Sequence, residues 1–143
     1  MQIEKMTRKH IDEVYEISKE QFKDSWTKQM FLQELENKFR MGFVAVLNGQ
    51  VAGFVNFLFL QDEMTILKIA TKECFKGQKI AFNLLDKSLT FAKDNGVSVV
   101  FLEVEDGNNP AIKLYEKFGF EVLKRRKNYY QGKIDAIEMF LNI

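Results

Sequence analysis

Residues 63–96 decide the fold, and they read EMTILKIATKECFKGQKIAFNLLDKSLTFAKDNG. The alternation over 63–71 predicts a strand. After Gly77, apolar residues recur at helical spacing until Asn95-Gly96, a pair that favours the end of a helix. The stretch therefore predicts a strand, a loop and a long helix, and the strand Val97–Val104 follows directly. The apolar helix positions are Ile80, Ala81, Leu84, Leu85, Leu89 and Ala92.

Upstream of this unit, the sequence predicts a strand over 2–6, two helices and a hairpin. Thr7 is expected to cap the first helix, and Ser25 or Thr27 to begin the second. The hairpin is indicated by Asn48-Gly49 between two stretches, 41–47 and 51–60, that are rich in β-branched and aromatic residues.

Downstream, the sequence predicts a short helix and two closing strands. Asn109 is the expected N-cap of a helix over about 110–118, and Gly119 stands where a helix end favours a left-handed residue. Strands over about 121–130 and 134–141 follow, with Gln131-Gly132 as the turn. The complete order is β-α-α-β-β-β-α-β-α-β-β, which predicts an α/β (α+β) domain built on a central sheet flanked by helices.

Composition limits the kind of protein. The 143 residues suit a single domain over 1–143, and 46% of them are hydrophobic, which is enough for a packed core. The net charge of +1 provides no general attraction for DNA or an anionic membrane. One cysteine, Cys74, and one histidine, His10, favour chemistry without a disulfide or a metal. Without an apolar targeting segment, we expect a cytoplasmic protein that is a monomer by default.

The element order resembles the GNAT superfamily of N-acetyltransferases over essentially the whole chain. That superfamily has a mixed, mostly antiparallel sheet, and its pyrophosphate-binding loop reads Arg/Gln-x-x-Gly-x-Gly/Ala. Lys76 and Ala81 match the ends of this pattern, and Leu84-Leu85 follows at the usual distance. The central Gly is Lys79 here, which either adds a charge for the phosphates or hinders close backbone approach. Alternatively, Gly77 simply begins a helix.

The resemblance implies acetyl-CoA as co-substrate. Its pantetheine would pair like an added strand with backbone groups of Ile69 and Thr71. The residues implied in binding are Ile69, Ala70, Thr71, Lys76, Gly77, Gln78, Lys79, Ile80, Ala81, Phe82 and Asn108.

Further motifs resemble the ribosomal-protein-alanine N-acetyltransferases, the RimI-type branch. In that branch a Leu-Glu-Val strand carries the general base, an Asn follows, and a Leu-Tyr-Glu helix supplies a general acid before Gly-Phe. The resemblance implies acetyl transfer from acetyl-CoA to a protein N-terminus, with a ribosomal protein as one candidate. The matching segments are Leu102-Glu103-Val104, Asn108, Leu114-Tyr115-Glu116, Gly119-Phe120, Asn128-Tyr129-Tyr130 and Trp26-Thr27 with Phe31.

Glu103 also makes chemical sense by itself. Alternation places it at the end of an apolar row formed by Val97, Val99 and Phe101, where burial is expected to raise its pKa. Such a carboxylate suits a general base, because a substrate ammonium must lose a proton before it attacks a thioester. The alternative is a strand-end carboxylate that pairs with a nearby lysine.

Tyr115 is the candidate general acid, since a phenol can protonate a departing thiolate. On spacing alone, it reads as a core tyrosine in the stripe Ala111, Leu114 and Phe118. Only the resemblance favours catalysis. A Cys74 nucleophile is disfavoured, because His10 lies in a different region of the chain.

The acceptor is harder to predict. Trp26, Tyr129 and Tyr130 are candidates for a peptide-binding rim, with ordinary aromatic packing as the alternative. The basic run Lys124–Lys127 is better explained as protection of an edge strand than as a contact to an acidic peptide or RNA. Two other functions stay open: a GNAT that acetylates a small-molecule amine, and a GNAT-shaped binding module weakened by Lys79.

Overall fold

The computed structural model describes residues 1–130, 132 and 134–143, without the side chain of Tyr130. Its element order is the one that the sequence predicts. Two short 3-10 turns, Arg8–His10 and Glu73–Phe75, are additional. The elements are β1 (Gln2–Lys5), α1 (Ile11–Gln21), α2 (Lys28–Glu36), β2 (Arg40–Leu47), β3 (Gln50–Leu60), β4 (Glu63–Thr71), α3 (Ile80–Asp94), β5 (Val99–Glu105), α4 (Asn109–Lys117), β6 (Glu121–Tyr130) and β7 (Ile134–Asn142).

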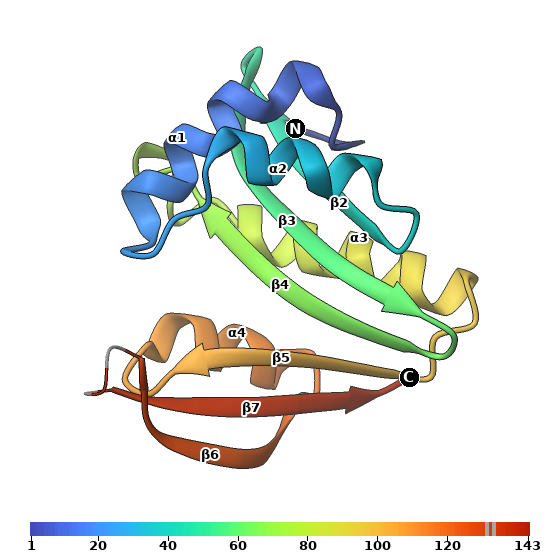
Figure 1. Cartoon of the computed structure of the whole chain (residues 1–143), viewed down its shortest axis with the longest axis vertical. Helices are drawn as coiled ribbons and strands as arrows, with labels where there is room; N and C mark the ends of the chain where they lie inside the picture. The colour runs from blue at the N-terminus through green and yellow to red at the C-terminus, as the bar shows by residue number, and fades with distance from the viewer. Residues whose placement is uncertain (131, 133) are drawn as a thin grey trace.

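The seven strands form one mixed, mostly antiparallel sheet in the order β1-β2-β3-β4-β5-β7-β6. The pair β4–β5 is parallel and short: Glu63–Thr65 align with Val99–Phe101, and the ladder stops there. Beyond these pairs the two strands diverge, as Figure 1 shows. The sheet therefore has a V-shaped opening in its middle rather than only at its perimeter.

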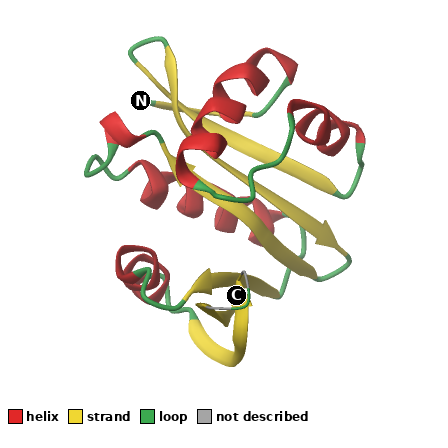
Figure 2. Cartoon of the chain, turned by 60° about the vertical axis from the view of Figure 1, so that its left-hand side comes forward, coloured by secondary structure: helices red, strands yellow, loops and turns green. Residues whose placement is uncertain are grey.

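Helices cover the two faces unequally. Helices α1 and α2 lie on one face of β1–β4, α3 lies on the opposite face, and α4 lies on that same side beside β5 (Figures 1 and 2). The apolar face of α3, including Leu84 and Leu85, packs against the sheet in one core cluster, and Val14 of α1 and Phe31 of α2 belong to the other. No helix lies over the front of β5 and β7 in Figure 1.

The hairpin prediction is confirmed. Asn48 and Gly49 adopt φ angles of 53° and 76° between β2 and β3. A tight turn with two positive φ angles matches the twist of the flanking strands, and Asn-Gly tolerates it better than other pairs do. Thr27 is the N-cap of α2, since its Oγ1 accepts the Met30 N–H at 3.1 Å.

Two capping predictions are wrong. Asn108, not Asn109, is the N-cap of α4: its Oδ1 accepts the Ala111 N–H at 3.4 Å, and Asn109 is already helical. Thr7 caps the 3-10 turn Arg8–His10, and α1 begins only at Ile11. The predicted turn Gln131-Gly132 includes Gln131, which lies outside the described residues; Gly132 has a φ of 68°.

Two possible features have no support in the described chain. No helix in it is long and apolar enough to span a membrane. Within the same residues, no group of three or more His, Cys, Asp or Glu side chains is arranged to hold a metal ion.

Gly53 fixes how closely α3 approaches the sheet. A Cβ at this position would lie 2.7 Å from the Ala70 carbonyl oxygen, 2.7 Å from Ile80 Cγ2 and 3.3 Å from Leu84 Cδ1. Since real side chains do not tolerate the two shorter contacts, β3 must have glycine where the first turn of α3 crosses it.

We expect Gly53→Ala to destabilise the fold by about 1–3 kcal/mol, the usual cost of overpacking a well-packed core. Urea unfolding followed by circular dichroism measures this as a lower midpoint with an unchanged slope. An unchanged midpoint would mean that α3 shifts without cost and that Gly53 does not fix its position.

Candidate active site

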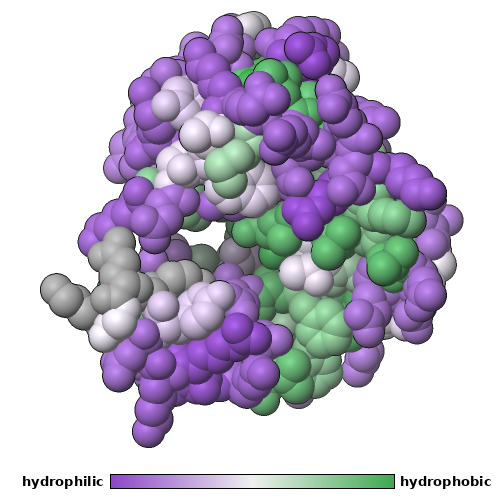
Figure 3. Space-filling view, in the orientation of Figure 1, coloured by the Kyte–Doolittle hydropathy of each residue, from purple (hydrophilic) through white to green (hydrophobic). Residues whose placement is uncertain are grey.

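A cleft of about 280 Å³ occupies the opening between β4 and β5. Figure 3 shows the corresponding hollow between the two halves of the molecule. Four sequence-predicted residues meet in it: Glu103 from β5, Tyr115 from α4, Asn108 from the N-cap of α4 and Ile69 from β4. The other described lining residues are Gln21, Phe22, Ile66, Leu67, Lys68, Leu102, Val104, Glu105 and Ala111.

Glu103 is not buried as we expected, since 31% of its side chain is exposed. Its neighbours on the same strand face, Val99 and Phe101, are only half-buried, whereas Val100, Leu102 and Val104 point into the core. The reason is that the covered face of β5 is the one toward α4, and no helix covers the other (Figure 1). The predicted apolar row is thus an open face, with Val97 outside the strand.

Charged residues surround Glu103. Glu138 of β7 lies directly opposite it in the ladder. Two like charges in that position repel. Arg126 offsets this repulsion, because its guanidinium lies 3.6 Å from both carboxylates. Lys124 also lies 3.6 Å from Glu138. The carboxylate of Glu103 is therefore held in place by a cation from β6.

A second cleft, of about 550 Å³, extends from Glu103 over the open face. Thr65, Leu67, Phe101, Tyr129 and Glu138 are among its lining residues. The ring of Tyr129 lies 5.3 Å from the Arg126 guanidinium, and half of this residue is exposed. Glu103 thus lines both clefts, and Tyr129 lines the second, as a rim residue would. The side chain of Tyr130 lies outside the described residues.

The basic run lies on β6, which is an edge strand of the sheet. Besides Lys124 and Arg126, Arg125 is paired, with Asp106 at 2.7 Å and Asp135 at 3.2 Å. These hydrogen bonds raise the pKa of Arg125. The Asn128 N–H bonded to Asp135, together with Arg125, lowers the pKa of that carboxyl. Intramolecular pairing of three of the basic residues supports a structural role for the run.

Tyr115 is both a core residue and a cleft residue. It is 5% exposed, and its ring makes an edge contact with Phe120 at 5.9 Å. Asn108 also lines the cleft while it caps α4. Helix α4 and its N-cap thus supply two of the predicted residues to the cleft.

The loop before α3 keeps a glycine-like backbone despite Lys79. Gly77 has a φ of 84° and Lys79 a φ of 61°, so both are left-handed. Lys79 is the N-cap of α3 and provides no side-chain cap for the first-turn N–H groups. These N–H groups have no carbonyl within the helix, and a helix N-terminus favours an anion. The loop Lys76–Ala81 therefore fits a pyrophosphate.

Other residues predicted for the loop lie around it. Lys76 forms an ion pair with Glu73 at 2.7 Å, and Gln78 is exposed. Phe82 is 39% exposed, and its ring centre lies 4.8 Å from that of Phe118, the C-cap of α4, which connects the two helices.

The edge of β4 that faces the opening fits an extended ligand. The Lys72 N–H bonds the Ala52 carbonyl of β3 at 2.8 Å. Because backbone groups alternate in direction along a strand, those of Thr71 and Ile69 point away from β3, toward the opening. The backbone groups of Ala70 point the other way, toward β3, and its side chain is buried in the core cluster of α1 and α2.

The structure adds a cleft residue that we did not predict from the sequence. Lys68 of β4 lines the cleft, with its Nζ 4.4 Å from the ring centre of Phe22 and 5.2 Å from that of Trp26. Burial lowers the pKa of Lys68, and Asp24 partly opposes this. Trp26 itself packs against Phe31 and supports Lys68. The sequence feature that could have indicated Lys68 is a lysine that interrupts the apolar residues of β4.

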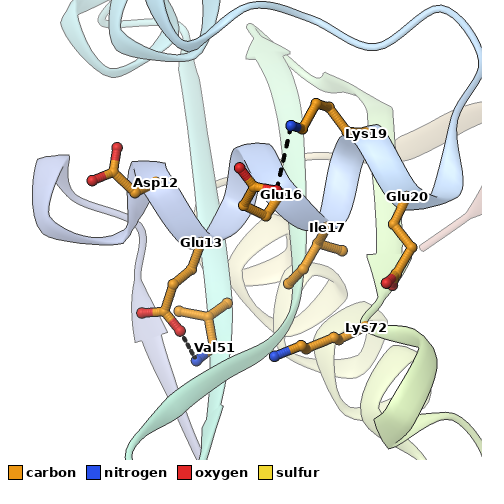
Figure 4. A pocket seen from close by; sticks show the side chains of 8 residues that line it. All are labelled: Asp12, Glu13, Glu16, Ile17, Lys19, Glu20, Val51 and Lys72. Atoms are coloured by element: carbon orange, nitrogen blue, oxygen red, sulfur yellow. Dashed lines mark hydrogen bonds and ion pairs between the residues drawn. The ribbon is translucent and has the colours of Figure 1, made fainter.

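Another cleft lies elsewhere, along α1 (Figure 4). Its volume is about 600 Å³, and four acidic residues of α1 line it together with Lys72. All four carboxylates have partners. Glu13 accepts the Val51 N–H at 2.8 Å, and Glu20 accepts the Glu73 N–H at 2.7 Å. Asp12 and Glu16 form ion pairs with Lys28 at 3.2 Å and Lys19 at 3.4 Å. The Val51 bond attaches α1 to β3, the Glu73 bond attaches it to the 3-10 turn Glu73–Phe75, and neither gives the cleft a catalytic arrangement.

A split mixed α/β sheet, a helix terminus that favours an anion, and a carboxylate and a phenol that line one cleft together fit an acyltransferase. The acetyltransferase (GNAT) family model matches residues 11–120. The chain belongs to this family and is an N-acetyltransferase.

Individual relatives agree with this assignment. The [ribosomal protein bS18]-alanine N-acetyltransferase of Escherichia coli (strain K12) is 32% identical over 121 residues, which are 82% of this chain and 81% of that protein. An N-alpha-acetyltransferase of Sulfolobus acidocaldarius is 31% identical over 151 residues, covering 96% and 90%. The crystal structure of the ribosomal-protein-S18-alanine N-acetyltransferase from Escherichia coli superposes with a TM-score of 0.92 at 29% identity, covering 99% and 93%.

We expect Lys79→Gly to preserve the loop and raise the melting temperature, because a left-handed residue with a Cβ costs about 1–2 kcal/mol. The greater freedom of glycine in the unfolded chain offsets part of that gain. Lys79→Val should lower the melting temperature, since branching at Cβ disfavours this backbone region further. Differential scanning calorimetry distinguishes the variants. Equal melting temperatures would indicate that Lys79 does not hold a strained conformation.

Proposed function

We propose that this chain transfers the acetyl group of acetyl-CoA to the α-amine at the N-terminus of a protein, as a ribosomal-protein-alanine type enzyme. The carrying observation is that Glu103 and Tyr115 line one cleft, in the opening where the β4 edge exposes Ile69 and Thr71. The names of the Escherichia coli and Sulfolobus acidocaldarius relatives support a protein acceptor. A ribosomal protein is one candidate.

Binding of acetyl-CoA is assigned to the β4 edge and the α3 terminus. The backbone of Ile69 and Thr71 would hold the extended part, and the loop from Lys76 to Ile80 would hold the pyrophosphate. Acetyl-CoA supplies an activated acetyl thioester. The protein then needs to bring an amine to it and to move two protons, so catalysis is positioning together with proton transfer.

Glu103 is assigned as the general base. It lies where the two clefts meet, so an amine arriving over the open face would reach its carboxylate before the inner cleft. Glu103 removes a proton from the ammonium, directly or through a water molecule. The uncharged amine then attacks the carbonyl carbon, and the C–S bond of the thioester breaks as the new C–N bond forms. The nitrogen loses its second proton in this step, and that proton restores the Tyr115 phenol after it has protonated the thiolate.

Tyr115 is assigned as the general acid. It lines the same inner cleft as Glu103, and its phenol gives a proton to the departing thiolate. The burial of its ring against Phe120 fixes its position. Neither step needs a covalent enzyme intermediate or a metal ion.

The second cleft, beside Tyr129, favours a peptide over a small amine. An acceptor N-terminus belongs to a chain that must leave the active site, and about 550 Å³ of open cleft beyond Glu103 provides room for it. Acetylation of a small-molecule amine is the alternative. A single domain over 1–143, a monomer and a cytoplasmic location remain predictions.

The catalytic pair is tested with Glu103→Gln and Tyr115→Phe in an assay of peptide acetylation by mass spectrometry. We expect each variant to lower kcat about 10²–10⁴-fold, the usual contribution of general acid–base catalysis. Both changes keep the side-chain size, so the melting temperature serves as the control. Unimpaired variants would refute the assigned roles, and modification of small amines alone would refute the peptide acceptor.

Acetyl-CoA binding is tested separately by thermal shift. A ligand at about a hundred times its dissociation constant stabilises the native state by about 2.7 kcal/mol, which raises the melting temperature. No shift at millimolar acetyl-CoA would instead support a binding module that has lost catalysis.

A further inference from the structure

Lys68 is a half-buried lysine whose ammonium lies over two aromatic rings. Lysine side chains at surfaces usually extend their charged end into solvent. Here Nζ lies over the rings of Phe22 and Trp26, at 4.4 Å and 5.2 Å. The loss of hydration lowers the pKa of Lys68. The two rings therefore hold a positive charge at one fixed place on β4.

This charge lies in the wall of the substrate clefts. Lys68 lines the cleft that contains Glu103 and Tyr115, and also a smaller one of about 230 Å³ toward Asp24, Glu105 and Ile134. No carboxylate of the described chain forms an ion pair with Lys68. Asp24 attracts the ammonium only from beyond ion-pair distance. A partly desolvated charge without a close carboxylate is costly, and a carboxylate brought by a ligand would reduce that cost.

The residue opposite Lys68 is polar as well. Asn56 of β3 pairs with Lys68 in the ladder, and Asn56 is only 3% exposed. Neither polar atom of its side chain has a hydrogen-bond partner within the described chain. Since paired residues share a face of the sheet, Asn56 and Lys68 form a polar pair among apolar neighbours. A buried amide without a hydrogen bond and a partly desolvated ammonium both lower the stability of the fold.

The cleft thus separates two kinds of charge. Glu103 and Glu105 of β5 line the wall that would meet the acceptor ammonium, and Lys68 lies on the wall across from them. Resting on the function proposed above, we propose that Lys68 is a specificity-determining residue that binds a carboxylate side chain at the second or third residue of the acceptor. Acceptors with a lysine or arginine there are disfavoured by like-charge repulsion.

The test uses peptides that share an N-terminal alanine and differ only by Glu, Gln or Lys at residue two or three. For the wild-type enzyme we expect kcat/KM at least about tenfold higher for Glu than for Lys at one of these positions. Lys68→Met should reduce this ratio to about twofold or less, and Lys68→Glu should reverse it. Equal rates for the Glu and Lys peptides, or a preference that survives in Lys68→Met, would overturn the proposal.

Two controls sharpen the result. Lys72→Gln removes a lysine just beyond the same strand, one that bonds Gln50 and lines the α1 cleft instead. The Glu-to-Lys ratio should stay at the wild-type value in this variant. Lys68→Met keeps the length of the side chain, and its melting temperature and acetyl-CoA thermal shift report whether the fold and the co-substrate site are intact.

Peptide binding is measured without turnover through Trp26, the single tryptophan of the chain. Because Trp26 lies against Lys68, binding of a carboxylate should change its fluorescence, and Lys68→Met should abolish the difference between Glu and Lys peptides. If no peptide is acetylated but this discrimination is present, the proposed function fails and the Lys68 assignment stands. If peptides are acetylated but Glu and Lys peptides are not discriminated, the Lys68 assignment fails and the proposed function stands.

Discussion

The short parallel ladder between β4 and β5 is the constraint on which the rest of the structure depends. Three aligned residue pairs join the two strands, and beyond Thr65 and Phe101 each strand follows its own partner. β4 stays with β3 and the layer of α3, while β5 stays with β7. The opening that results exposes backbone groups of β4 and side chains of β5. Each candidate catalytic residue takes its place from this divergence.

Local patterns predicted the elements well, because they depend on chemistry within a few residues. Asn48-Gly49 predicts a hairpin since its backbone conformation is the one that the turn needs. The spacing of apolar residues predicts α3 for a similar reason. Caps were less predictable: Asn108 and Asn109 are equivalent as residue types, and only the backbone angles decide which of them ends the loop.

The environments of Glu103 and Lys68 depend on tertiary structure. Alternation places Glu103 on a face, but whether a helix covers that face is decided by α1 and α2, which lie over other strands (Figure 1). The position of Lys68 depends on an irregularity in the pairing of β3 with β4. Asn56 pairs with Lys68, but the next residue of β3, Phe57, pairs with Ile66, so the register shifts by one residue on β4. Met64 and Ile66 therefore join the core of α3, while Ala70 joins the core of α1. Strict alternation, which the sequence suggests, would have placed all of them together.

A strand edge in the middle of a sheet also carries a hazard for the protein. Exposed backbone groups such as those of Ile69 and Thr71 are a template on which a strand of another chain can pair. Charged side chains oppose such pairing at edges, and here Lys68 on one border and Glu103 and Glu105 on the other flank the opening. The residues that prepare the cleft for its ligands thereby also make it a poor site for aggregation while it is empty.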